Sequence, residues 1–305
     1  MKKVGITLLM LVAVIMSTVA VTNVVYGENS RLERINKPVQ FFKGKPEASI
    51  SGREFMISID TVEFWKREDM IVDAILSGNM PSELKQFQKI VFTTPIVDSV
   101  KILRKPHKVE ILVLADYLSV GSDDDFVRMP MGPLAAQQIA DSLNCILPTS
   151  YLVDRIAEVS EGHIDIFPFR PLGGRNMQPI VFQDSDNAIK ALFKAKGYEF
   201  GQFISGLKKD VVLTYKIQSR DEMKKYEAIY GWHHPDGRTQ QPLFVRHGNF
   251  YVDYSHGIRL INRTVVVDGK KYDAKAILES PTLYRLLSDE PEPLKKASYA
   301  GNPKW

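Results

Sequence analysis

The sequence predicts an α+β fold, with helices mainly in the middle of the chain and a mostly antiparallel sheet in the C-terminal half. Apolar residues recur at helical spacing in residues 133–143, 149–159 and 185–196. From residue 210 onward, short segments rich in β-branched and aromatic residues follow one another between turn signals. The two kinds of segment do not alternate as βαβ units do, so a regular parallel sheet is not expected.

Before residue 133 the patterns predict helices and strands in mixed order. Residues 65–76 have the apolar spacing of a helix, which Gly78 and Pro81 end. The near-continuous apolar run at residues 108–114 predicts a strand that is buried on both faces. The other elements predicted here are strands at residues 55–59 and 89–93 and a short helix at residues 82–87, capped by Ser82.

Three consecutive aspartates, Asp123, Asp124 and Asp125, follow the predicted strand at residues 108–114. Their carboxylates could bind a hard cation. Because the calcium-loop spacing DxDxDG is absent, the sequence favours a solvated loop whose aspartates cap helices.

The middle helices carry recognisable start and stop signals. Pro133 suits a first helical turn, and Thr149 or Ser150 can cap the next helix. Gly197 ends the third helix, which is predicted to begin near a cap at Asp184. Residues 162–182 contain several prolines and glycines and are predicted as a long surface loop.

The last third of the chain is predicted to consist mainly of strands and turns. Asp268-Gly269 is the pair that favours a two-residue hairpin turn, and Pro281 divides a helical segment at residues 276–287. The predicted strands are residues 210–217, 226–230, 250–254, 257–261, 263–267 and 271–274.

Composition and the N-terminus indicate an exported globular protein. The chain has 305 residues, 44% of them hydrophobic and 25% charged, which is enough to form a sizeable core. Lys2 and Lys3 precede an apolar run at residues 5–21. We expect residues 1–27 to be a signal peptide or an uncleaved anchor, and the protein to be periplasmic, on the cell surface or secreted. No later stretch is apolar for long enough to span a bilayer, so no further integral membrane segment is expected.

The remaining chain is expected to comprise a linker or arm at residues 28–50, one globular domain at residues 51–295 and a polar tail at residues 296–305. The net charge is +4, and it is +2 without Lys2 and Lys3. Because charges of both signs are interspersed, the sequence does not indicate a nucleic-acid partner.

The segment between His233 and His256 is the strongest candidate for a functional site. It contains four of the six histidines of the chain, together with Asp236 and Asp253. Histidine is suited to proton transfer near neutral pH. We therefore predict His256 and His233 as proton-transfer residues and Asp253 as the group that orients or activates them.

Neighbouring residues could bind a substrate. Trp232, Tyr251 and Tyr254 could stack on sugar rings, or they could be half-buried residues of a sheet. Lys208 and Lys209 could attract an anionic group, or they could be solvated. The predicted substrate-binding residues are Trp232, Tyr251, Lys209, Asp210 and His247.

A divalent metal such as Zn²⁺ is a possible cofactor. His233, His247, Asp253 and His256 are chemically suitable ligands, although the chain contains no HExxH motif. Side chains alternate along a strand, so Asp253 and His256 would point to different faces unless a bulge or a turn intervenes.

The single cysteine, Cys145, excludes an internal disulfide. It could act as a nucleophile with His256 as its base. Its apolar neighbours, Leu143, Ile146 and Leu147, favour a buried and unreactive thiol instead.

Two resemblances concern the same region. The segment Ser255-His256-Gly257-Ile258-Arg259-Leu260 resembles the SHGCIRL signature of the L,D-transpeptidase family, whose cysteine is the nucleophile. Here Ile258 follows Gly257 directly, so the resemblance implies that chemistry only if the fold places Cys145 beside His256.

The chain also resembles a family of exported bacterial proteins to which no activity is assigned. The resemblance implies that the matching stretches form one family-wide unit, and it implies no reaction. The stretches are DYLSVGSDDDF (116–126), CILPT (145–149), LKKDVVLT (207–214), YGWHHPDG (230–237), QPL (241–243) and YVDYSHGIRL (251–260).

These observations together predict an exported hydrolase that acts on a cell-envelope or extracellular polymer, either peptidoglycan or a polysaccharide. One alternative is a non-catalytic glycan-binding or scaffold protein of the envelope. The other is a cysteine–histidine peptidase or amidase that uses Cys145.

Overall fold

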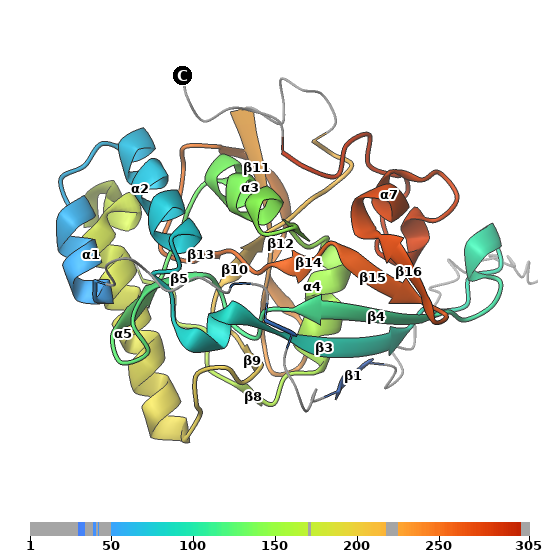
Figure 1. Cartoon of the computed structure of the whole chain (residues 1–305), viewed down its shortest axis with the longest axis horizontal. Helices are drawn as coiled ribbons and strands as arrows, with labels where there is room; N and C mark the ends of the chain where they lie inside the picture. Colours follow the sequence, from blue (N-terminus) through green and yellow to red (C-terminus); the bar gives the residue numbers. More distant parts are fainter. Residues whose placement is uncertain are drawn as a thin grey trace, which may run out of the picture.

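Two larger sheets, two two-stranded sheets and the helices around them make up the described part of the chain (Figure 1). The computed structural model describes residues 30–33, 39–40, 42, 50–169, 172–217 and 225–299. The predicted signal segment and residues 300–305 lie outside these ranges, as does most of the predicted linker. The combination of helices with antiparallel-rich sheets confirms the predicted α+β class.

The larger sheet has eight strands, and β4 is its branching point. β4 pairs with β3 along its length, with β14 at Val113 and with β15 at Glu110, always antiparallel. The strands are β1 (Ser30–Glu33), β2 (Val39–Gln40), β3 (Gln86–Thr93), β4 (Lys108–Val113), β7 (Cys145–Ile146), β14 (Ile261–Asn262), β15 (Thr264–Val267) and β16 (Lys270–Asp273). The predicted burial of β4 on both faces is wrong, because Glu110 and Leu112 lie on a partly exposed face.

The smaller sheet has four strands in the order β12-β11-β10-β13. Its strands are β10 (Lys209–Val211), β11 (Tyr226–His233), β12 (Thr239–Gly248) and β13 (His256–Gly257). β10 and β13 run parallel, and the other pairs are antiparallel. Within the described ranges β12 has β11 as its single neighbour, and it contains Pro242. Two further pairs are β5 (Ser119–Gly121) with β6 (Phe126–Arg128) and β8 (Gly162–His163) with β9 (Ile204–Ser205).

Some of the helices lie at the two ends of the molecule, whereas α3 and α4 lie between them (Figure 1). In Figure 1, α1, α2 and α5 lie on the left, whereas α7 and the β15–β16 hairpin lie on the right. The α-helices are α1 (Gly52–Ile59), α2 (Phe64–Leu76), α3 (Pro133–Ser142), α4 (Ser150–Glu158), α5 (Pro179–Lys196) and α7 (Ala274–Glu279). The 3₁₀ helices are η1 (Ser82–Lys85), η2 (Lys101–Leu103), η3 (Leu172–Met177) and η4 (Tyr284–Leu286). α4 packs against β11, and this contact builds one wall of the candidate site.

Most predicted helices are confirmed, but the short helix predicted at residues 82–87 is a 3₁₀ helix that ends at Lys85 and has no side-chain cap, and residues 86 and 87 belong to β3. The strand predicted at residues 55–59 is wrong, because this segment is α1. Ser51 and Glu54 form a reciprocal capping box, and Phe55, Met56 and Ile59 are buried on one helical face. α5 begins at Pro179 rather than near residue 185, so the predicted surface loop is shorter.

The aspartate loop caps helices, as the sequence favoured. Asp123 accepts a hydrogen bond from the backbone N–H of Ser82, at the start of η1. Asp125 accepts one from the N–H of Arg53 in the first turn of α1. Both carboxylates therefore satisfy amide groups that have no partner within their own helices.

The C-terminal part of the chain contains the predicted hairpin turn, a segment without the predicted strand and a buried tyrosine. Asp268 and Gly269 both have positive φ, 49° and 80°, as the predicted hairpin turn requires. The strand predicted at residues 250–254 is wrong, because residues 249–255 form an irregular connection between β12 and β13, with a turn at each end. Tyr299 is buried beyond the predicted domain end at residue 295, and its hydroxyl donates to Val212 and accepts from the N–H of Ala228.

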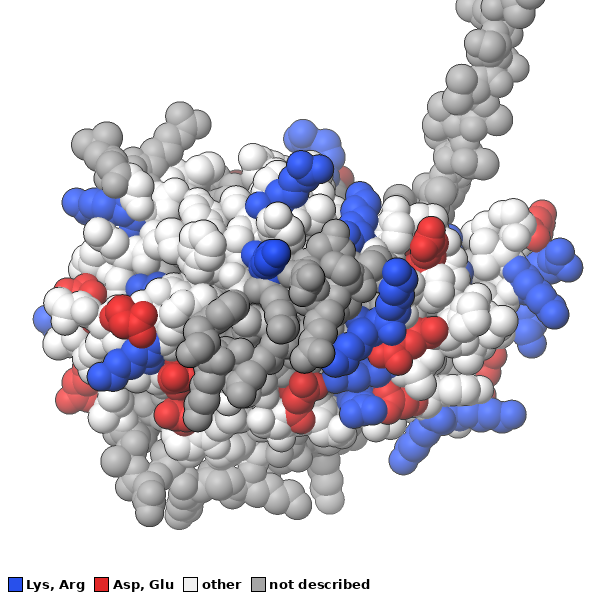
Figure 2. Space-filling model, turned by 90° about the horizontal axis from the view of Figure 1, so that it is seen from above, with Lys and Arg blue, Asp and Glu red and all other residues white. Residues whose placement is uncertain are grey.

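The surface of the described residues is mixed in charge. On the face seen in Figure 2, Lys and Arg side chains are interspersed with Asp and Glu side chains. In the ranges that the structure describes, no helix is both long enough and apolar enough to cross a bilayer.

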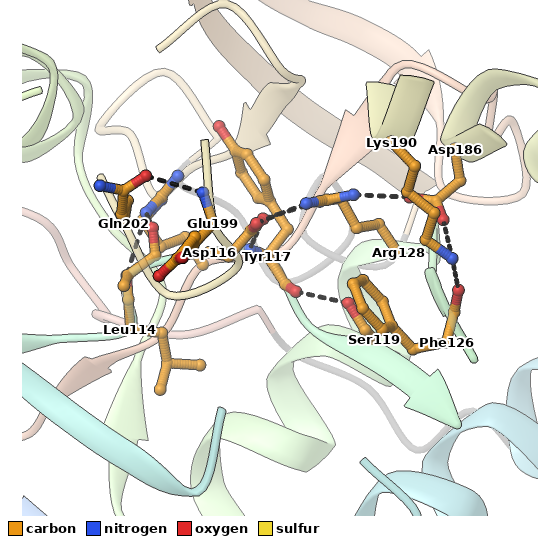
Figure 3. Close-up of polar contacts among 12 residues, drawn as sticks. Leu114, Asp116, Tyr117, Ser119, Phe126, Arg128, Asp186, Lys190, Glu199 and Gln202 are labelled. Atoms are coloured by element: carbon orange, nitrogen blue, oxygen red, sulfur yellow. Dashed lines mark hydrogen bonds and ion pairs between the residues drawn. The ribbon is translucent and has the colours of Figure 1, made fainter. Parts of the chain in front are cut away.

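A buried ion network joins three distant parts of the chain (Figure 3). Arg128 on β6 donates from Nε and Nη2 to both oxygens of Asp116, at 2.9 and 2.7 Å, and from Nη1 to Asp186 on α5, at 2.9 Å. The side chain of Arg128 is 1% exposed, and both carboxylates are fully buried. Burial alone would lower the pKa of Arg128, but the two carboxylates outweigh it and raise the pKa. Arg128 is therefore charged, and it compensates two carboxylates in the interior.

Replacing Arg128 should destabilise the fold strongly. Arg128→Met would leave Asp116 and Asp186 buried without their common partner, a change that costs about 3–5 kcal/mol in comparable networks. Urea unfolding monitored by circular dichroism measures the loss. The matched control is Arg238→Met, which removes an exposed ion pair with Asp236 and should leave the free energy of unfolding nearly unchanged. Equal stability of Arg128→Met and the wild type would contradict this role.

Candidate functional site

A polar cleft of about 1060 Å³ lies beside the C-terminal end of α4 and the turn between β11 and β12. Its walls include Asp154, Glu158, His163, His233, His234 and Arg238. This volume is at the upper end of the range of small-molecule sites, about 300–1,000 Å³. The cleft therefore has room for a ligand of small-molecule size or slightly larger.

His233 is held in the cleft wall by Asp154. Its Nε2 lies 2.9 Å from Oδ1 of Asp154, and the hydroxyl of Tyr230 donates to the same oxygen, also at 2.9 Å. In the neutral imidazole, an Nε2–H that donates to Asp154 leaves Nδ1 as an acceptor. The carboxylate thus fixes both the orientation and the tautomer of His233.

The backbone before His233 is unusual. Gly231 and Trp232 have φ values of 102° and 57°, and the register of β11 against β12 shifts between Ile229 and Gly231. A positive φ is rare for a bulky residue such as Trp, and bulges of this kind often redirect a side chain next to an active site. The indole of Trp232 donates to the carbonyl of Gly206 at 2.7 Å, which holds this conformation in place.

A second, much smaller cavity of about 20 Å³ lies next to the cleft. His233 and Ser205 line both spaces, so the imidazole stands at their junction. Its polar lining residues Tyr117, Lys208, Asp210, His233 and Arg259 are all buried.

In this small cavity, the carboxylate of Asp210 has a hydrogen bond at only one of its two oxygens among the described residues. Its Oδ2 accepts a hydrogen bond from the hydroxyl of Tyr117 at 2.9 Å. Its Oδ1 is buried and has no hydrogen-bond partner among the described residues. Burial raises the pKa of Asp210 to about 6, although Arg259 and Tyr117 act in the opposite direction.

Two cations lie near Asp210 but are fixed by other partners. Arg259 donates to the carbonyls of Leu114 and Ala115, and its guanidinium lies 4.4 Å from the ring centre of Tyr117. Lys208 donates to a backbone carbonyl of the turn before β13, and burial lowers its pKa to about 8.

His256 occupies a separate, buried centre. Its Nδ1 lies 3.2 Å from Oε1 of Glu227, and its Nε2 lies 3.9 Å from Oδ1 of Asp253. The prediction that Asp253 and His256 serve different faces is wrong. The chain turns between them, with the N–H of His256 donating to the carbonyl of Asp253, so strand alternation does not apply.

Burial favours uncharged forms in this second centre. It lowers the pKa of His256 to about 4, although Asp253 opposes the shift. It also raises the pKa of Glu227 well above the ordinary value, and the charges of Asp253 and Glu68 add to that effect. The side-chain oxygens of Glu227 and both ring nitrogens of His256 have no hydrogen-bond partner among the described residues.

The expected aromatic platform is mostly buried. Trp232 and Tyr254 are 5% and 6% exposed. Tyr251 is half-buried and stacks on His247, with ring centres 4.5 Å apart. Lys209 lies over the ring of Trp232, 5.4 Å from its centre. The three aromatic residues therefore do not offer one shared surface.

The candidate metal ligands are divided between the two centres. His233 lines the cleft, whereas His247, Asp253 and His256 lie together elsewhere. In the part of the chain that the structure describes, no group of three or more His, Cys, Asp or Glu side chains is arranged to hold a metal ion. Glu227 and Asp253 approach opposite nitrogens of His256, so they do not surround one point.

Cys145 lies in the larger sheet and His256 in the smaller one. The thiol is fully buried, and its Sγ donates to the carbonyl of Leu143 at 3.3 Å. Burial raises the pKa of Cys145 to about 12.

Several residues of both centres carry no distinctive sequence signal. Asp154 has the place of an ordinary polar residue on a helix, and Tyr117 follows a strand. Glu227 is a charged residue within an otherwise β-like segment, and this mismatch is the signal that could have indicated its burial. The chain matches no protein-family model, and it has no significant match among curated proteins or solved structures.

Replacing Glu227 should change how stability depends on pH. Because its pKa is raised in the folded state, the native protein keeps a proton that the unfolded chain loses as pH rises above about 4.5. The wild type therefore loses stability from this group with rising pH, and Glu227→Gln removes the loss. Urea unfolding at pH 5 and pH 8 should show the variant gaining stability over the wild type at the higher pH.

The same change at the exposed Glu292 is the control and should give no pH-dependent difference. A difference between Glu227→Gln and the wild type that stays constant between the two pH values would contradict the raised pKa.

The thiol of Cys145 should be unreactive in the folded protein. With its pKa raised to about 12, very little thiolate is present at pH 8. Iodoacetamide should therefore label the protein in urea but not in buffer, as read by mass spectrometry. Rapid labelling of the folded protein would contradict a buried thiol.

Proposed function

We propose that the protein is a hydrolase acting on a cell-envelope or extracellular polymer, with His233 as its general base. The observation that carries this proposal is the pair of His233 and Asp154, at the junction of a large cleft and a small polar cavity. A histidine oriented by a carboxylate, with its other nitrogen free to accept a proton, is a recurrent arrangement for general base catalysis.

The tautomer of His233 determines which of its nitrogens can take a proton. Nδ1 of His233 takes a proton from a water molecule as the water oxygen bonds to the electrophilic carbon of the substrate. Asp154 stabilises the imidazolium that forms, and the imidazolium then gives its proton to the leaving group as the old bond breaks. Protons and electron pairs balance, and the histidine returns to its starting state.

Two features support a polymeric substrate outside the cytoplasm. The cleft volume suits more than one unit of a chain. The N-terminal pattern of two lysines followed by an apolar run favours export. We assign catalysis to His233 rather than to His256 because His256 is fully buried and lines neither the cleft nor the small cavity.

Replacing His233 should abolish turnover. His233→Ala removes the base, and the rate should fall about 10²–10⁴-fold. The measurement is the release of soluble fragments from peptidoglycan and from common polysaccharides by the purified full chain. The matched control is His234→Ala, because His234 lies in the same cleft but bonds to Gln240; it should keep most of the activity.

Two outcomes would refute the proposal. One is a wild-type protein without turnover on any of these polymers. The other is His233→Ala with wild-type activity.

A further inference from the structure

The small cavity behind His233 has the size and polarity of a site for one water molecule. Its volume is about 20 Å³, and a single water needs at least about 10–15 Å³ measured in this way. Water occupies a buried cavity only where polar partners are present. Here Asp210, His233, Tyr117 and Arg259 line the space, with apolar side chains such as Val153 and Phe203 completing its walls.

Two side chains that line the cavity, Asp210 and His233, can accept hydrogen bonds. Oδ1 of Asp210 is buried and has no hydrogen-bond partner among the described residues. Nδ1 of His233 is an acceptor in the tautomer that Asp154 selects, since Nε2 makes the bond to that carboxylate. One water molecule has two O–H groups, so it can donate to both acceptors at once.

The structure holds Asp210 rigidly in this position. β10 pairs with β11 on one side and with β13 on the other, so Asp210 sits between Tyr230 and Gly257 in the sheet. Tyr117 fixes the second carboxylate oxygen. Its ring reaches Asp210 across Gly257, where a Cβ atom would lie only 2.5 Å from Cδ1 of Tyr117. The glycine therefore allows the contact that orients the carboxylate.

We infer that this cavity binds the nucleophilic water of the reaction and that Asp210 is a second catalytic residue. The inference rests on the proposed function. One O–H of the water donates to Oδ1 of Asp210 and the other to Nδ1 of His233, which leaves an oxygen lone pair to attack the substrate in the cleft. His233 takes the proton as the new bond forms, whereas Asp210 keeps its charge and holds the remaining O–H.

The ionisation of Asp210 gives the mechanism a pH dependence. An ionised Oδ1 accepts a hydrogen bond from the water. A protonated Oδ1 donates instead, so the water could no longer donate an O–H to it and would change its orientation. The titratable groups around Asp210 are Tyr117 on the turn after β4, Lys208 just before β10, His233 on β11 and Arg259 on the segment after β13. With a pKa of about 6 for Asp210, activity should fall as the pH drops through that value.

The test combines kinetics with a structural readout. Asp210→Asn keeps the shape of the side chain but not its charge, so kcat should fall at least 10-fold while KM stays within about twofold, because the water does not bind the substrate. The control is Asp184→Asn, an exposed residue of α5 that lines neither the cleft nor the small cavity and should keep the wild-type kcat. A high-resolution crystal structure of the wild type should show one ordered water within hydrogen-bonding distance of Oδ1 and Nδ1.

The possible failures can be told apart. If His233→Ala is inactive but Asp210→Asn keeps the wild-type kcat, the role of Asp210 is refuted and the hydrolase proposal stands. If the wild type has no turnover, the hydrolase proposal fails and the catalytic role of Asp210 fails with it. If the crystal structure shows a dry cavity, the water site is refuted even where Asp210→Asn does not fold.

Discussion

The double ion pair of Arg128 is the constraint on which the rest of the structure depends. It holds β6, α5 and the turn after β4 together through charges that are completely removed from water. Asp116, one of its two partners, is followed directly by Tyr117, which contacts Asp210 in the candidate site. The position of Asp210, the catalytic carboxylate that we propose, therefore depends on the buried ion pair of Arg128 with Asp116. A shift of Arg128 would move the small cavity.

The two histidine centres lie in the same sheet but differ in burial. His233 and His256 belong to β11 and β13 of the same four-stranded sheet, and each has a carboxylate close to a ring nitrogen. His233 borders a cleft. His256 is enclosed, and its environment opposes charge on both the imidazole and Glu227. Similar groups thus differ in their access to solvent, because Asp154 is partly exposed whereas Glu227 is fully buried.

The sequence predicted those features that depend on neighbours along the chain. The cap at Thr149, the stop at Gly197 and the hairpin turn at Asp268 all follow from local backbone chemistry. Residues 55–59 are predicted as a strand because a short apolar run fits the periodicity of both a strand and a helix. The capping box of Ser51 and Glu54 favours the helix that the segment forms.

The candidate site was predicted only in part. The concentration of histidines located His233, but the pairing with Asp154 joins residues 79 positions apart. The burial of Glu227 involves residues far along the chain, Glu68 on α2 and Asp253, and its one local sign is a charged residue within a β-like segment. The turn between Asp253 and His256 reversed the expected directions of their side chains. Long-range packing therefore determined which of the predicted residues face a cavity.

The long strand β12 has a consequence for how the protein behaves at high concentration. Its ten residues extend for about 34 Å with one paired edge among the described residues. An open edge of that length invites another chain to add a strand, which is a route to aggregation. Pro242 has no N–H, so it interrupts the row of donors near the middle of the strand. A single residue without an evident role in the site would then keep molecules of this protein from joining edge to edge.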